Sequence, residues 1–394
     1  MVHSEEPVGF SIYERDRRWA RVRSLMKDAD IDVIIGVANT GLWGGLQGSV
    51  RYLTNLGASN SLTSAVFPAD AAVTAVTVIE AHQSRKLWID DVRPAMFDHF
   101  SAIIDRLREL RVHTHRIGIV GLTTSTRLPD GYVAHHGMQR MSEAFPHARF
   151  VDATHLMDHA RADKSGEELD VLRRAVAFAE GAAVVMADNV RPGTPQSAAY
   201  GAIFGYLAEN GCELPTMVQW AVGNPHVGTA VAGAPLRPFI TGDALRTELE
   251  ANWGGYHGQI TMMKTLRPLS QREEDAFALQ MAALEACYRL CRPGVVLRQM
   301  YDACTELAKG SQFSCHLMMN GRGLGDDAPL ILPQGNTPRM LDWSIQENET
   351  FVIKPMVRHP DGSSVQWGGV VAATTAGAKG LGSHRPAILC SDND

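Results

Sequence analysis

Two stretches of the chain have the same pattern of a turn followed by a helix, and this internal repeat limits the possible folds more than any other feature. RPGTPQSAAYGAIFGYLAENG, from Arg191, and RPGVVLRQMYDACTELAKGS, from Arg292, each place an R-P-G turn before a helical pattern. Each turn also follows a longer helical pattern, and the two turns are 101 residues apart. Such a period predicts a duplicated helix–helix–strand unit and therefore a pseudo-symmetric domain.

Strand-like runs follow both helical units. Ser165 and Glu168 form an S-x-x-E capping box, which predicts the start of the first long helix. Gly254 and Gly255 lie between two long strand-like runs, so these runs are expected to form a hairpin. The runs that suit a pleated sheet are 218–223, 243–253, 256–266, 350–357 and 364–374.

The first part of the chain alternates helical and strand-like patterns. Helices are expected over 12–30, 96–110 and 131–145, and strands over 31–38, 63–67, 72–79, 116–121 and 149–151. This alternation favours a three-layer α/β domain. We therefore predict two domains, 1–158 and 159–394.

Bulk properties exclude several classes of protein. The net charge of −6 gives no basic surface for nucleic acid, and no apolar run reaches the roughly 20 residues of a membrane helix. The start lacks the apolar core of a signal peptide, and none of the six cysteines forms a C-x-x-C pair. We expect a cytoplasmic protein without nucleic-acid or membrane partners.

Six segments, in the same order and at similar spacing, resemble the creatinase/aminopeptidase P/methionine aminopeptidase family. They are RADKSGEEL, GNPHV, GD-x-L with GGYHGQITMMKT, NGRGLGDDAP, ENETFVIKPMV and SSVQWGGVVAAT, within residues 161–374. The resemblance implies a two-domain α/β protein. A creatinase-like amino-terminal three-layer α/β domain would precede a carboxy-terminal, pseudo-symmetric pita-bread α+β domain.

In that family, two aspartates, one histidine and two glutamates hold two divalent metal ions. Carried over onto this chain, the five positions fall on Glu248, Gln259, Arg322, Lys354 and Trp367, or on Gln366 if the last register slips by one. Neither a guanidinium nor an ammonium has a free lone pair for a metal. Two such cations would repel a divalent ion by several kcal/mol at short range. We therefore predict that the chain has lost the metal site.

The altered pocket gathers other polar side chains, because residues two apart on a strand share a face. Glu250 is expected beside Glu248, and His257 beside Gln259. His226 matches the family's histidine in GNPHV and is our predicted general acid/base, with Glu248, Glu250 and His257 as further catalytic candidates. An inert site filled by the ion pairs Glu248–Lys354 and Glu250–Arg322 is the alternative.

The predicted substrate-binding residues include the two cations. Arg322 and Lys354 would anchor a carboxylate, beside Gln259, Trp367 and Tyr256. Arg51 and Tyr52, in VRYLTNL (50–56), would reach the neighbouring active site across a homodimer interface, since the amino-terminal domain does so in dimeric relatives. A buried strand end within the same subunit is the other interpretation of this segment.

These residues predict a metal-independent enzyme that acts on a small carboxylate-bearing molecule without a cofactor. Hydrolysis of a C–N bond is the first choice, with creatinase as the metal-free precedent. A lyase, cyclase or decarboxylase using His226 to move a proton is the second. The third possibility is a catalytically inactive binding or scaffold protein.

Overall fold

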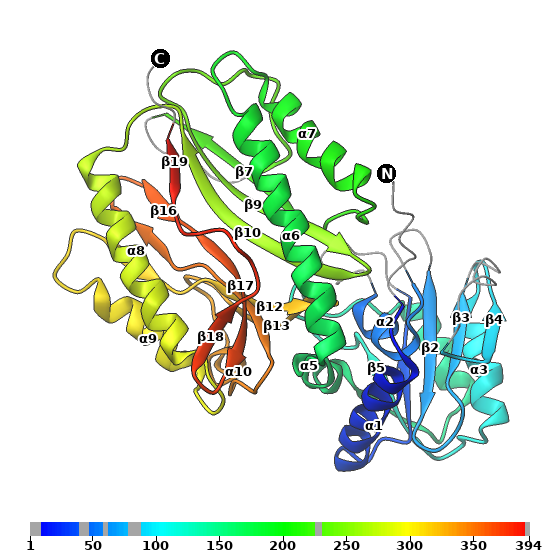
Figure 1. The fold of residues 1–394 in the computed structure, drawn as a ribbon. Coiled ribbons are helices and arrows are strands. Elements are labelled where there is room, and N and C mark those ends of the chain that lie inside the picture. The colour runs from blue at the N-terminus through cyan, green and yellow to red at the C-terminus, as the bar shows by residue number, and fades with distance from the viewer. Residues whose placement is uncertain (1–8, 39–46, 58–61, 78–87, 225–230, 391–394) are drawn as a thin grey trace. The chain divides into compact units, whose positions relative to one another are not determined.

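The computed structural model describes residues 9–38, 47–57, 62–77, 88–224 and 231–390 (Figure 1). Contacts divide the chain into two compact units. Residues 1–161 and 324–327 form the first unit, and 162–323 with 328–394 form the second. The division falls three residues beyond the boundary that the sequence predicts.

The first unit is a six-stranded sheet with helices, in the strand order β4-β3-β2-β1-β5-β6. Strands β1, β5 and β6 run parallel, whereas β1 and β2 are antiparallel. Apolar side chains from β1, β5, α3 and α4 form its core. Its elements are α1 (Ile12–Asp28), β1 (Val33–Gly36), α2 (Gly48–Thr54), β2 (Thr63–Pro68), β3 (Thr74–Thr77), β4 (Asp91–Pro94), α3 (His99–Glu109), β5 (Arg116–Val120), α4 (His135–Ala144), β6 (Arg149–Asp152) and α5 (Thr154–Ala162).

The VRYLTNL segment is helical, so its interpretation as a strand end is wrong. It lies in α2, which ends at Asn55 in the left-handed conformation that asparagine tolerates. The β-branched and aromatic residues suggested a strand. Burial of Val50, Tyr52 and Leu53 on the tertiary scaffold outweighs that weak local preference.

The second unit contains one large sheet, a smaller sheet and two pairs of helices. The helices are α6 (Gly166–Asn189), α7 (Gln196–Glu209), α8 (Gln271–Leu290), α9 (Leu297–Leu307) and the short α10 (Pro338–Leu341). The strands are β7 (Val218–Gly223), β8 (Val231–Ala232), β9 (Ala244–Trp253), β10 (Tyr256–Thr265), β11 (Ser314–His316), β12 (Met319–Gly323), β13 (Gly325–Ile331), β14 (Thr350–Ile353), β15 (Met356–Arg358), β16 (Ser364–Gln366), β17 (Gly368–Thr374), β18 (Gly377–Gly380) and β19 (Ile388–Cys390).

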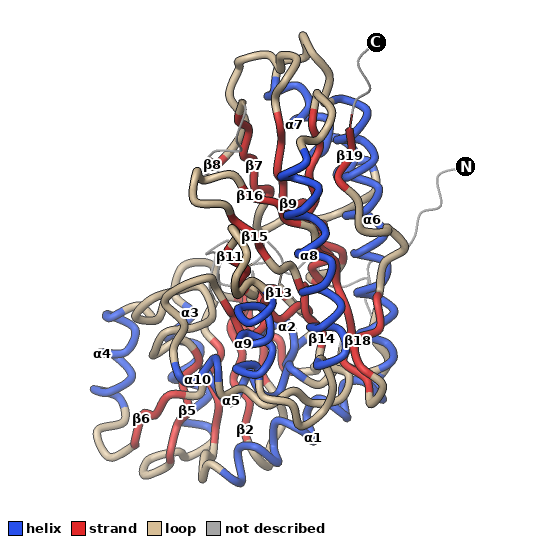
Figure 2. Tube along the Cα trace, turned by 90° about the vertical axis from the view of Figure 1, so that its left-hand side faces the viewer, coloured by secondary structure: helices blue, strands red, loops and turns tan. Residues whose placement is uncertain are grey.

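The strand order shows the predicted pseudo-symmetry. The main sheet runs β13-β12-β14-β17-β10-β9-β7-β8, so two antiparallel triplets meet where β17 pairs with β10. Helices α6 and α7 precede the triplet β7, β9 and β10, and α8 and α9 precede β12, β14 and β17 (Figures 1 and 2). The pita-bread fold is thereby confirmed.

Local chemistry explains the ends of the principal elements. The Ser165–Glu168 capping box is present at the start of α6, and Ser270 with Glu273 caps α8 in the same way. Gly254 and Gly255 both have positive φ in the tight turn between β9 and β10, so the predicted hairpin is confirmed.

One face of the hairpin lies under a helix and the other carries the candidate site. A Cβ on Gly258 would lie 2.2 Å from the Ala175 backbone of α6, so the strand and helix backbones touch there. Since side chains alternate along a strand, His257 and Gln259 point to the opposite face. Glu250 pairs directly with Gln259 and shares that face.

Two of the predicted strands are interrupted beside the site. The run over 350–357 divides into β14 and β15 around Lys354 and Pro355, because proline has no N–H for the sheet. The run over 364–374 divides at Trp367. The NGRGLG segment, which resembles a glycine loop, instead forms β12 and the start of β13.

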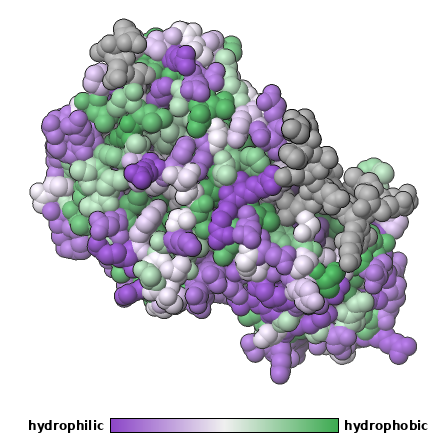
Figure 3. Space-filling view, viewed as in Figure 1, coloured by the Kyte–Doolittle hydropathy of each residue, from purple (hydrophilic) through white to green (hydrophobic). Residues whose placement is uncertain are grey.

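None of the helices in the described ranges is both long and apolar enough to cross a membrane. On the visible face of the molecule, hydrophilic and hydrophobic residues are interspersed (Figure 3).

Candidate functional site

Glu248 lies at one centre of a buried polar network. Its Oε2 accepts hydrogen bonds from the Lys354 ammonium and from Gln259 Nε2, the latter at 2.8 Å. The Gln259 carbonyl in turn accepts a hydrogen bond from Arg322. Glu248 and Gln259 come from the first strand triplet, whereas Arg322 and Lys354 come from β12 and the end of β14. The network therefore joins the two halves of the fold.

Glu250 is the second centre and is fully buried. Its Oε2 accepts a hydrogen bond from Arg322 Nη1 at 2.6 Å. Its Oε1 accepts hydrogen bonds from the Thr216 N–H at 2.6 Å and from the Thr216 hydroxyl. Burial raises the pKa of Glu250, but the Arg322 charge and the hydrogen bonds lower it by more, to well below its usual range. Glu250 is therefore an ionised carboxylate, which only accepts.

His257 lies beside Glu250, and this contact fixes its tautomer. Its Nδ1 is 2.9 Å from Glu250 Oε1, and because a carboxylate accepts, Nδ1 must carry the proton. The other ring nitrogen, Nε2, is buried without a hydrogen-bond partner among the described residues. A neutral ring thus presents Nε2 as an acceptor, whereas a charged ring would bury an unpaired N–H, which is costly.

The charges of the network cancel. Two carboxylates, Glu248 and Glu250, face two fixed cations, Lys354 and Arg322, and all four side chains are buried. Both ion pairs of the inert-site interpretation are therefore formed. Each carboxylate receives one charged donor from the other half of the fold, Arg322 for Glu250 and Lys354 for Glu248.

This set of side chains does not fit the pair of divalent ions that the family resemblance implies. A guanidinium and an ammonium stand among the positions where the family has ligands, and both are donors only. In the described ranges, no three His, Cys, Asp or Glu side chains converge to hold a metal ion.

The fifth carried-over position does not join the network. Trp367 belongs to the apolar core and lines a cavity of about 160 Å³, whose walls also include Val176 of α6 and Tyr288 of α8. It therefore faces the helices. Gln366 donates to the Lys354 carbonyl at 3.1 Å. Gly368 packs against the base of the Lys354 side chain, since a Cβ on this glycine would lie 2.3 Å from the Lys354 Cβ.

Replacing Gly368 by alanine is expected to destabilise the protein by about 1–3 kcal/mol, because the added methyl overlaps Lys354 Cβ and the Ile353 carbonyl. Chemical denaturation followed by tryptophan fluorescence measures the change. Gly369→Ala is the matched control, since its Cβ would meet nothing closer than Trp367 at 3.5 Å. Equal stability of the two variants would contradict the close packing of Gly368 on Lys354.

The remaining predicted site residues lie elsewhere. Tyr256 is buried and its hydroxyl donates to Glu168 at 2.7 Å, which ties it to the capping box of α6 rather than to the charged network. Tyr52 is also buried, and its hydroxyl donates to the Ala160 carbonyl within the first unit. Arg51 lies on the same helix, α2. His226 lies outside the described residues.

Two family profiles together match most of the chain. The profile of metallopeptidase family M24 matches residues 170–375, and that of the creatinase/prolidase N-terminal domain matches residues 18–162. The chain belongs to metallopeptidase family M24. The resemblance of the six motifs to this family is thus confirmed, and so is the fold class.

Relatives of this M24 chain are distant. A Xaa-Pro dipeptidase of Lactobacillus helveticus is 25% identical over 308 residues, covering 74% of this chain and 77% of that protein. Methionine aminopeptidase 1 of Dictyostelium discoideum is 23% identical over 145 residues, or 36% of this chain and 39% of that protein. The solved Xaa-Pro dipeptidase from Bacillus anthracis superimposes with a TM-score of 0.76 at 17% identity, covering 96% of this chain and 100% of that one.

Three residues of the M24 site were missed by the sequence reasoning. Thr216 gives two hydrogen bonds to Glu250, but its position before β7 carries no motif. Gly368 follows Trp367 directly, so a shift of the last motif by one residue toward the carboxy terminus would have predicted it. Arg246 lies two residues before Glu248 on β9 and matches no family motif, and only the structure shows its hydrogen bond to Ser364.

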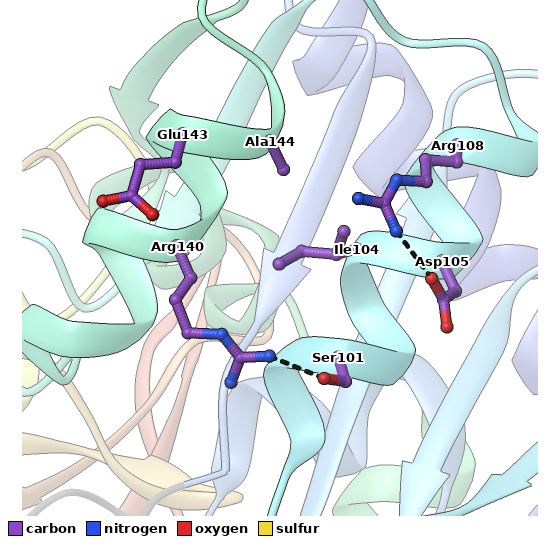
Figure 4. A pocket seen from close by; sticks show the side chains of 7 residues that line it. All are labelled: Ser101, Ile104, Asp105, Arg108, Arg140, Glu143 and Ala144. Atoms are coloured by element: carbon purple, nitrogen blue, oxygen red, sulfur yellow. Dashed lines mark hydrogen bonds and ion pairs between the residues drawn. The ribbon is translucent and has the colours of Figure 1, made fainter.

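A hollow of about 360 Å³ lies on the first unit between α3 and α4 (Figure 4). Its two arginines are both paired. Arg140 donates to Asp98 at 2.8 Å and to Ser101 at 2.6 Å, and Arg108 donates to Asp105 at 3.0 Å. These are exposed ion pairs on a helical surface, and no function is assigned to them.

Proposed function

We propose that this M24 protein is a metal-independent hydrolase that cleaves a C–N bond in a small carboxylate-bearing molecule. The observation that carries the proposal is the neutral network of Glu248, Glu250, Arg322 and Lys354. Two built-in cations balance the carboxylates at the centre of the fold, so no metal charge is needed there. Membership of a metallopeptidase family and similarity to two Xaa-Pro dipeptidases support hydrolysis.

His226 is the proposed general acid/base, as the family resemblance implies. It would remove a proton from water while the water oxygen attacks the carbon of the C–N bond. The same proton would then pass to the leaving nitrogen as the bond breaks. Glu248 and Glu250 would orient the water and any positively charged atom of the substrate, while each carboxylate keeps its ion pair within the protein.

His257 is the second proposed proton carrier. Glu250 orients its ring and fixes the proton on Nδ1, which leaves Nε2 as a base. The support is the buried Nε2, for which the described residues supply no donor. A substrate N–H or O–H would satisfy this atom.

Arg322 and Lys354 could anchor a substrate only if they gave up their present ion pairs. Each already binds a carboxylate of the protein, so a substrate carboxylate would have to displace Glu250 or Glu248. Displacement would leave a protein carboxylate buried and unpaired, which costs several kcal/mol. Another anchor is therefore more favourable.

A catalytically inactive binding or scaffold protein is the second candidate. The specific observation in its favour is that both pairs of the inert-site interpretation are complete. If the purified protein turned over none of a set of N-substituted amino acids, this result would favour the inactive protein over the hydrolase.

We further propose a cytoplasmic homodimer in which Arg51 and Tyr52 belong to the subunit interface. All six cysteines are free thiols, as suits a reducing compartment. Sedimentation velocity of the purified protein tests the oligomeric state. A monomer at micromolar concentration would contradict the dimer.

The purified protein is expected to release amine from at least one N-substituted amino acid and to keep this activity in excess EDTA, because fixed cations do the work of the metal charges. The panel would contain dipeptides, N-carbamoyl, N-acyl and guanidino acids, with amine release followed by a colorimetric assay. Elemental analysis is performed on the same sample. Stoichiometric manganese, iron, cobalt or zinc, or loss of activity in EDTA, would contradict metal independence.

Isotope labelling separates hydrolysis from the lyase, cyclase and decarboxylase alternatives. A turnover carried out in water enriched in oxygen-18 places one labelled oxygen on the carbon that loses nitrogen, because water is a reactant. The label appears in the acid released from a dipeptide or N-acyl substrate and in the urea released from a guanidino acid. Mass spectrometry reads the incorporation. A product formed without the label would contradict hydrolysis and favour a lyase or cyclase.

A further inference from the structure

A cationic patch adjoins the charged network on the same face of the second unit. Arg246 lies two residues before Glu248 on β9, and its Nη1 donates to the Ser364 hydroxyl on β16 at 2.6 Å. Ser364 pairs with Arg358 on β15, so the two arginines flank one serine. His316 on β11 pairs with Met356 and shares the face of Arg358. We call Arg246, Ser364, Arg358 and His316 the cationic patch.

The two arginines of the patch have no carboxylate bonded to them among the described residues. Arg246 uses one of its five N–H donors on Ser364, and Arg358 contacts only the Met356 sulfur, at 3.5 Å. Arg246 is half-buried, whereas Arg358 is exposed. The arginines of the hollow on the first unit, Arg108 and Arg140, are in contrast each bound to an aspartate.

Electrostatics agree with this geometry. Burial lowers the pKa of Arg246; the Glu248 charge opposes that change and the nearby Arg358 charge adds to it. Burial and the Arg358 charge likewise lower the pKa of His316, whose Nδ1 is buried and unpartnered in the described part of the chain. Glu248 accepts hydrogen bonds from Lys354 and Gln259, and its charge offsets only part of the effect of burial on the pKa of Arg246.

We infer that the cationic patch is the subsite for the substrate's carboxylate, with Arg246 as its central donor. A carboxylate would accept paired hydrogen bonds from a guanidinium fork and relieve the repulsion between two neighbouring cations. The Ser364 hydroxyl holds the Arg246 side chain in place for this contact. The inference rests on the proposed function, and it replaces Arg322 and Lys354 as the anchor.

Position along the strand also limits the size of the substrate. Arg246 and Glu248 share one face of β9, and residues two apart on a strand are separated by about 7 Å. A carboxylate bound at Arg246 would therefore place the next few atoms of the molecule beside Glu248 and Lys354. The chemical class that fits is a short acid, such as an N-substituted amino acid, rather than a long peptide.

Calorimetric titration tests the subsite without any turnover. The probes are acetate, glycine and glycylglycine, with glycylglycinamide as the matched compound that lacks the carboxylate and inorganic phosphate as a second anion. At least one carboxylate should bind to the wild type, and Arg246→Gln and Arg358→Gln should weaken that binding by roughly ten- to a hundredfold. Arg289→Gln, on an exposed ion pair of α8, should leave it unchanged.

Four outcomes would overturn the subsite. They are absence of binding for all three carboxylates, unchanged binding in Arg246→Gln, equal binding of glycylglycinamide, and equal binding of phosphate. Failure of the proposed function has a different signature. Carboxylate binding without C–N hydrolysis leaves the subsite standing, whereas hydrolysis with an unchanged kcat/KM in Arg246→Gln overturns the subsite alone.

Discussion

Replacing Arg322 by methionine is expected to lower the free energy of unfolding by about 3–5 kcal/mol, because one partner of a fully buried ion pair is removed. The Glu250 carboxylate would keep the hydrogen bonds from Thr216 and His257 but lose its only fixed cation. Gln259 would lose its donor as well. The contact between β12 and the β9–β10 hairpin would therefore fail at its centre.

Urea denaturation followed by tryptophan fluorescence measures this loss, and a second variant separates charge from packing. Glu250→Gln combined with Arg322→Met removes both charges, so the double variant should recover part of the loss. Arg289→Met breaks an exposed pair with Glu285 and should change the stability by less than about 1 kcal/mol. If Arg322→Met lowered the free energy of unfolding by no more than Arg289→Met does, the network would contribute little to stability.

His226→Ala is expected to reduce kcat by about 10²–10⁴-fold on whichever carboxylate-bearing substrate is found, because the proposed general acid/base is removed. Steady-state amine release measures the effect. The matched control is His136→Ala, since His136 is exposed on α4 in the first unit.

The pH dependence of kcat distinguishes a catalytic histidine from a structural one, because removal of a structural histidine would leave its shape unchanged. The wild type should show a limb near neutral pH, and this limb should be absent from the residual activity of His226→Ala. Activity that survives the substitution, with the same pH profile, would contradict the role of His226. His257→Gln would then be the next variant, because His257 is the other proposed proton carrier.

Local patterns predicted the elements well wherever a single periodicity ran through a segment. The long helix α6 begins at the Ser165–Glu168 capping box, as the sequence predicts, and α8 begins at a box of the same kind. The glycine hairpin was predictable because only glycine adopts both positive φ values easily. VRYLTNL was not, since its helical conformation depends on burial in the first unit rather than on local preference.

The composition of the site was predictable from motif positions, but its geometry was not. The motifs gave Glu248, Gln259, Arg322 and Lys354, which do form one network. They also gave Trp367, which faces the helices, because the strand breaks there and the register places Gly368 against Lys354. A one-residue shift along a strand reverses the face of a side chain, and motif spacing cannot exclude such a shift.

By itself, the sequence determined the family and the duplicated architecture, because both follow from residue type and order. It also gave the prediction that two cations, Arg322 and Lys354, stand where the family has metal ligands. Only the tertiary structure decided which charges neutralise each other. Glu250 and Arg322 are 72 residues apart, and Glu248 and Lys354 are 106 apart. Their pairing, and the absence of a carboxylate partner for Arg246 in the described ranges, depend on how four strands meet at the centre of the sheet. Coulomb interactions act over a few ångströms of space, and the sequence alone does not give those distances.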